Sequence, residues 1–89
     1  MRWEDVAYVK DSPLSKKILE CLEASNRPLT PIEMAKKTNI ASSNVSTKLG
    51  GLRERKLVVC INPETKKSRF YMITKKGKDT LKQYEKLYK

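Results

Sequence analysis

Residues 30–55 read TPIEMAKKTNIASSNVSTKLGGLRER, and this stretch decides the fold. It opens with a capping box, in which the Thr30 hydroxyl accepts a hydrogen bond from the backbone of Glu33 and the Glu33 carboxylate accepts one from the backbone of Thr30. Pro31 takes the first helical position, where its missing N–H costs nothing. The box therefore predicts a short helix over residues 30–38.

A tight turn and a second helix complete the stretch. Asparagine takes a left-handed backbone position more readily than any residue except glycine, so we expect Asn39 to make the turn. The next helix, over residues 42–55, has apolar side chains at i, i+4 and i+7, which are Val45, Leu49 and Leu52. Two short helices joined by a tight turn form a helix-turn-helix.

Two adjacent glycines, Gly50 and Gly51, stand inside this second helix. Each glycine costs about 1 kcal/mol relative to alanine in a helix interior. Two interpretations follow: either the glycines let a partner approach the backbone closely, or the helix bends or ends at this point.

The sequence before the motif supplies one more helix. Residues 12–25 are expected to form it, because Ser12 is a good cap and Pro13 suits the first helical position. Residues 1–11 are expected to form an N-terminal arm.

The sequence after the motif predicts a hairpin and a last helix. Residues 57–73 hold two short β-prone runs around a polar, basic loop, which is typical of a β-hairpin "wing". Residues 75–88 are expected to form a C-terminal helix. Residues 1–89 thus form one α+β, mostly helical domain: a winged helix-turn-helix, with a three-helix bundle, a two-stranded β-wing and a C-terminal helix.

The composition excludes several classes of function. The 89 residues carry 20 Lys and Arg, 10 Asp and Glu and no histidine, a formal net charge of +10, which favours a polyanionic partner. Without histidine, and with Cys21 and Cys60 far apart, we expect no enzyme, no metal site and no cofactor. The longest apolar run, residues 57–61, is far too short to span a bilayer. No secretion signal is visible, so we expect a cytoplasmic protein without a membrane partner.

The order of these elements resembles the winged helix-turn-helix domain over residues 12–82. More narrowly, it is similar to MarR- and ArsR-like transcriptional regulators, and most of all to their small archaeal members. The most distinctive segments of the resemblance are NPETKK at residues 62–67, which leads to Arg69, and YMITKKG at residues 71–77. Before residues 12–82, WEDVAYV at residues 3–9 resembles the lead-in of the archaeal proteins. The Cys and His clusters of ArsR-like metal sensors have no counterpart here, so metal sensing is not implied.

Helical geometry assigns a binding face. With the apolar stripe towards the core, the polar start of the second helix faces outward, where helix-turn-helix proteins enter the major groove of double-stranded DNA. The residues expected there are Ser42, Ser43, Asn44, Thr47 and Lys48. Asn44 fits adenine, and Lys48 fits guanine or a phosphate. On the wing, Lys66, Lys67 and Arg69 are expected to reach phosphates or the minor groove. A solvated polar face is the alternative.

The C-terminal helix carries Leu81, Tyr84 and Tyr88 at i, i+3 and i+7. Part of this apolar stripe must cover the core. The side chains of the stripe that the core does not need are expected to pair, together with Trp3 from the arm, with a second copy and form a homodimer. Core packing alone is the alternative.

Together these observations predict a sequence-preferring, double-stranded DNA-binding transcriptional regulator. Two other classes remain: a winged-helix protein-interaction module of a transcription complex, and a non-specific nucleic-acid coating protein. The ratio of specific to random DNA binding at matched salt distinguishes the regulator from the coating protein.

Overall fold

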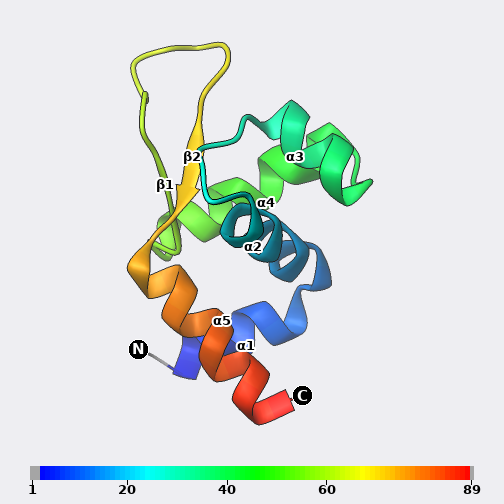
Figure 1. Ribbon diagram of the computed structural model, residues 1–89, viewed down its shortest axis with the longest axis vertical. Helices are drawn as coiled ribbons and strands as arrows, with labels where there is room; N and C mark the ends of the chain where they lie inside the picture. The colour runs from blue at the N-terminus through cyan, green and yellow to red at the C-terminus, as the bar shows by residue number, and fades with distance from the viewer. Residues whose placement is uncertain (1–2, 89) are drawn as a thin grey trace.

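A computed structural model describes residues 3–88, and within this range it contains five helices and a two-stranded antiparallel sheet (Figure 1). The elements follow in the order α1 (Trp3–Asp11), α2 (Pro13–Ser25), α3 (Pro31–Thr38), α4 (Ser42–Glu54), β1 (Val58–Cys60), β2 (Tyr71–Ile73) and α5 (Lys75–Tyr88). The helices α3 and α4 form the helix-turn-helix, and the β1–β2 hairpin forms the wing. The predicted winged helix fold is confirmed.

Local side-chain chemistry starts α2 and α3 as predicted. The Ser12 hydroxyl accepts a hydrogen bond from the Ser15 backbone at 3.4 Å and caps α2. At α3, the Thr30 hydroxyl accepts from the backbone of Glu33 at 3.2 Å, and the Glu33 carboxylate accepts from the backbone of Thr30 at 3.0 Å. This reciprocal pair satisfies two N–H groups that the first helical turn leaves without partners.

The turn between α3 and α4 forms at Asn39, whose φ of 61° lies in the left-handed region. Ile40 and Val45 are buried behind the turn, where the two helices meet. The helix α4 then begins directly after Ala41, which caps it without a side-chain hydrogen bond, and Arg55 caps its other end.

The N-terminal segment differs from the expectation of an arm. Residues 3–11 form the helix α1, which buries Val6 and Val9 and packs against α5 and α2; residues 1 and 2 lie outside the described residues. With only two aliphatic residues on its buried face, the segment is too short for periodicity to reveal a helix. The bundle therefore includes α1 and α5, which lie side by side at the end of the molecule opposite the wing (Figure 1).

The wing is tied to the helices through its second strand. Val59 pairs with Met72 across the hairpin, and both side chains are exposed. On its other side, β2 pairs with the α2–α3 connection, where Tyr71 and Leu29 exchange backbone hydrogen bonds of 2.8 and 3.0 Å. This bridge, which the sequence did not indicate, holds the wing beside the start of α3.

The α4 helix runs unbroken through both glycines, so it does not end early. A Cβ at Gly51 would collide with the hydroxyl of Tyr8 on α1, whereas nothing lies within 4 Å of a Cβ at Gly50. A close approach to the backbone is therefore observed at Gly51, but it is made by Tyr8 of the same chain, and the approach of a partner stays a prediction.

One core joins the elements. Its buried side chains come from all five helices, β1, β2 and the connections, and include Val9, Ile18, Leu22, Leu29, Met34, Val45, Leu49, Leu52, Leu57, Tyr71 and Leu81. At the start of the last helix, the Thr74 hydroxyl accepts a hydrogen bond from the backbone of Gly77 at 3.0 Å. Gly77 in turn lies against the Leu57 carbonyl, where a Cβ would not fit.

Candidate nucleic-acid interface

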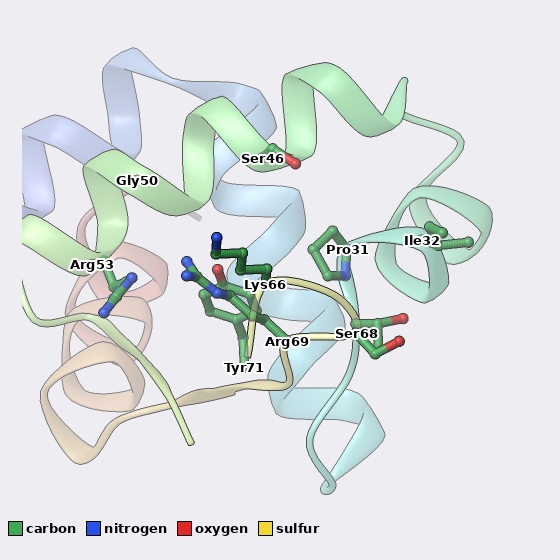
Figure 2. A pocket seen from close by; sticks show the side chains of 10 residues that line it. Pro31, Ile32, Ser46, Gly50, Arg53, Lys66, Ser68, Arg69 and Tyr71 are labelled. Atoms are coloured by element: carbon green, nitrogen blue, oxygen red, sulfur yellow. The ribbon is translucent and has the colours of Figure 1, made fainter. Parts of the chain in front are cut away.

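A hollow of about 500 Å³ lies between the start of α3, the outer face of α4 and the wing (Figure 2). It is lined by Thr30, Pro31, Ile32, Ser46, Gly50, Arg53, Lys66, Ser68, Arg69 and Tyr71. Since α4 contributes one wall and the wing loop the other, the hollow is a product of the tertiary fold.

The hollow is cationic. Arg53, Lys66 and Arg69 reach into it from α4 and from the wing, and their nitrogen atoms point towards the same space in Figure 2. No carboxylate stands among the lining residues, and within residues 3–88 none of the three cations takes part in a salt bridge. Cations of one sign in a concave surface attract anions more strongly than the same charges spread over a convex one.

The wing loop is ordered by its own hydrogen bonds. Asn62 braces it, because its side-chain oxygen accepts from the backbone of Phe70 at 2.7 Å and its Nδ2 donates to the Ser68 carbonyl at 3.1 Å. The Nε of Arg69 donates to the Thr65 carbonyl at 2.6 Å. This bond holds the Arg69 side chain by one nitrogen and leaves its two terminal nitrogens available to an anion.

The expected groove-facing residues lie on the surface of α4. Ser42, Ser43, Asn44 and Thr47 are exposed, and Lys48 is half-buried. The Thr47 hydroxyl donates to the Ser43 carbonyl at 3.0 Å and keeps its acceptor lone pairs. None of the five lines the hollow; they lie on the first two turns of α4 and are called the polar strip below.

The three wing residues expected to contact DNA do not all line the hollow. Lys66 and Arg69 line the hollow, whereas Lys67 is exposed outside it. Sequence reasoning missed Ser46, Gly50 and Arg53, which line the hollow from α4. Their spacing of i, i+4 and i+7 places them on one flank of the helix, and this spacing is a signal that could have identified them.

The residues expected at a dimer interface have different environments. Leu81 is only 1% exposed and belongs to the core, so it is not available to a second copy. Tyr84 packs partly against the core and stacks on Tyr88, with ring centroids 5.1 Å apart. Tyr88 is 48% exposed and Trp3 is 63% exposed, so these two side chains form the accessible part of the set.

Cysteines, metal-ligand clusters and membrane-spanning helices were the other features to consider in the described residues. Cys21 and Cys60 are both free thiols, and burial raises the pKa of Cys21 above its ordinary value of 9.0, which keeps it protonated at neutral pH. Among residues 3–88, no three His, Cys, Asp or Glu side chains come together as a metal site would require. No helix in the same range has the length and apolar character needed to cross a bilayer.

Solved structures with the same fold include three proteins of greater length. RV1404 from Mycobacterium tuberculosis is 17% identical, with a TM-score of 0.75, and the match covers 93% of this chain and 58% of that one. A mutant of S. aureus MepR is 18% identical, with a TM-score of 0.75 and coverages of 96% and 66%. The transcriptional repressor CouR, bound to a 23-mer DNA duplex, is 31% identical, with a TM-score of 0.74 and coverages of 94% and 59%.

The chain thus spans 58% to 66% of the length of these three proteins. A search of the curated proteins found no match. A family described as winged helix-turn-helix matches residues 14–89, which is most of the sequence. The fold, the helix-turn-helix and this match agree: the chain belongs to the winged helix-turn-helix family.

Proposed function

We propose that this protein is a sequence-preferring, double-stranded DNA-binding transcriptional regulator of the MarR- and ArsR-like kind, similar to the small archaeal members. The observation that carries the proposal is the hollow, in which three unpaired cations from α4 and the wing converge beside an exposed polar strip of α4. The likeness to CouR, whose structure holds a DNA duplex, supports it.

The polar strip is proposed to read bases. When α4 enters the major groove, its first turns approach the base edges. Asn44 then pairs with the N6 and N7 of adenine, Lys48 with guanine or a phosphate, and the hydroxyls of Ser43 and Thr47 with either kind of partner.

The hollow is proposed to hold the sugar-phosphate backbone. Each strand of the duplex separates the major groove from the minor groove. When α4 lies in the major groove and the wing lies at the minor groove, the strand between the two grooves passes between α4 and the wing. In this arrangement Arg53, Lys66 and Arg69 contact its phosphates, and Ser42 at the N-terminus of α4 contacts another. Lys67, outside the hollow, extends the wing contact towards the next phosphate or the minor groove.

Selection of bound duplexes from a random pool, at two salt concentrations, tests the proposal. We expect an enriched sequence, and for six to eight phosphate contacts a slope of log affinity against log salt of about −5 to −7. Asn44→Ala and Lys48→Ala should relax the preference at one or two base pairs. Lys67→Ala should weaken all sequences alike and reduce the salt slope by about 1.

Lys82 is the matched control, because it is an exposed lysine on α5, the helix that packs beside α1 at the end of the molecule opposite the wing (Figure 1). Lys82→Ala removes one charge, as Lys67→Ala does, and should leave the salt slope unchanged. A pool without enrichment, or equal effects of the Asn44, Lys48 and Lys67 variants on specific and random duplexes, contradicts the base-reading assignment.

A protein-interaction module is the second candidate, and one observation favours it. The outer face of the wing exposes an apolar row made of Val59, Ile61 and Met72. Apolar side chains grouped on a surface are typical of protein contacts. If this row were the working surface, Val59→Ser and Met72→Ser would abolish capture of a partner while DNA binding stayed weak and unselective.

A further inference from the structure

Asp5 on α1 is a buried carboxylate at the C-terminal end of α4. It is only 3% exposed, and two cations face it. One terminal nitrogen of Arg55 lies 3.4 Å from its Oδ1, and the Lys76 ammonium lies 3.2 Å from its Oδ2, in an ion pair without hydrogen-bond geometry. A buried charge requires such partners, because an unpaired one is strongly destabilising. Asp5 therefore links α1 to the cap of α4 and to the first turn of α5.

Arg55 is held at both its side chain and its backbone. Its guanidinium lies over the ring of Tyr8, 4.3 Å from the centroid, and its carbonyl accepts a hydrogen bond from Lys76 at 2.7 Å. Since Arg55 is the C-cap of α4, these contacts fix where that helix ends.

The hydroxyl of Tyr8 occupies the place that a Cβ at Gly51 would take. Gly51 lies one turn before Arg55 on α4, so Tyr8 contacts the helix through its hydroxyl and supports Arg55 with its ring. Two side chains of α1, Asp5 and Tyr8, thus engage the last turn of α4.

We propose that Asp5 and Tyr8 are positioning residues for DNA binding. They hold α4 at the angle at which its polar strip and the hollow meet one duplex together. Neither residue lines the hollow or belongs to the polar strip, so they act through Arg55 and Gly51. The inference rests on the proposed function and adds to it a dependence of DNA affinity on α1.

Asp5→Asn and Asp11→Asn form a matched pair of variants. Each removes one negative charge from α1, and Asp11 is exposed. If charge alone mattered, both variants would bind DNA more tightly, because a more positive protein attracts the phosphates more strongly. Positioning predicts the opposite for Asp5→Asn, with affinity for the preferred duplex reduced about tenfold, while Asp11→Asn binds at least as tightly as the wild type. Affinities are compared at a temperature where circular dichroism shows all proteins folded.

A second set of variants tests the same positioning role if Asp5→Asn does not fold. Gly51→Ala forces the Tyr8 hydroxyl out of its place, and should weaken binding. Tyr8→Phe in the Gly51→Ala background removes only the colliding oxygen, since the ring carbon beside it is 3.4 Å from the added Cβ. The double variant should therefore regain the affinity of Tyr8→Phe alone.

Folded Asp5→Asn protein that binds the preferred duplex as tightly as Asp11→Asn would overturn the positioning role. So would Gly51→Ala protein with wild-type affinity. Wild-type protein that binds no duplex overturns the proposed function, and the positioning role with it. That failure is recognised without any variant, so the two failures are distinguishable.

Discussion

Gly50 and Gly51 are neighbours on α4 with opposite surroundings. Gly50 lines the open hollow, whereas Gly51 faces α1 and leaves room for the Tyr8 hydroxyl. The helix-propensity cost of the two glycines is the same. Only at Gly51 does a contact within the folded chain offset it.

This difference predicts opposite effects of the same substitution on stability. Gly50→Ala should raise the free energy of unfolding by about 1 kcal/mol, because alanine favours the helix and meets empty space. Gly51→Ala should lower it by up to about 2 kcal/mol, because the overpacking cost of displacing Tyr8, about 1 to 3 kcal/mol, exceeds the roughly 1 kcal/mol that alanine gains in the helix. Urea unfolding of the two variants measures both values. A stabilising Gly51→Ala would show that the Tyr8 contact does not constrain the helix.

Arg53 shows why one residue of the cationic hollow could not be identified from the sequence. An exposed arginine on an amphipathic helix is ordinary. It becomes part of a cationic cluster only because the wing folds back and brings Lys66 and Arg69 to the same hollow. Asn44 and Lys48 could be named from the sequence, since their place on α4 follows from the helical repeat.

At the scale of elements, α3 is the most locally determined helix. Its start carries the Thr30 and Glu33 box, and its end is the left-handed Asn39. The Glu33 carboxylate also bonds Arg27 at 3.0 Å. The hydrogen bond from the Thr30 backbone, and then that from Arg27, holds the pKa of Glu33 below its ordinary value of 4.5.

Two variants test the box. Thr30→Ala should cost about 1 kcal/mol of unfolding free energy at neutral pH, because it removes the cap acceptor. The pKa of Glu33 is lower in the folded than in the unfolded protein. Ionised Glu33 therefore stabilises the fold fully at pH values above its unfolded-state pKa, and this stabilisation is lost as the pH falls through its folded-state pKa. Urea unfolding from about pH 6 to about pH 3 should therefore show a flatter pH dependence for Glu33→Gln than for the wild type. Parallel curves would contradict the role given to Glu33.

At the scale of the whole molecule, the two ends differ in character. The wing occupies one end, and α1 and α5 lie side by side at the other (Figure 1). Three large apolar side chains of α1 and α5 are exposed, namely Trp3, Leu87 and Tyr88. Lys10 lies over the Tyr88 ring at 4.8 Å and covers part of it. Aromatic side chains left exposed at one end favour contact with a second copy.

We expect two copies to pair through this end in a twofold homodimer, with recognition helices about 34 Å apart and a pseudo-palindromic site. Sedimentation at micromolar concentration should give twice the chain mass of 10.3 kDa. Trp3→Ser with Tyr88→Ser should shift the mass towards that of one chain, while Leu81→Ala should unfold the protein, because Leu81 lies in the core. A wild-type mass of one chain under these conditions excludes the dimer there.

The sequence by itself determined the features that depend on neighbours along the chain. The caps at Ser12 and Thr30, the turn at Asn39 and the stripe of α4 are local, because each needs only side chains within one or two helical turns. Only the tertiary structure decided that residues 3–11 form a helix, that Leu81 is buried, and that the hollow and the Asp5 network exist. These features join groups that lie far apart in sequence, such as Asp5 and Arg55, and no local pattern records which distant partner will complete a contact.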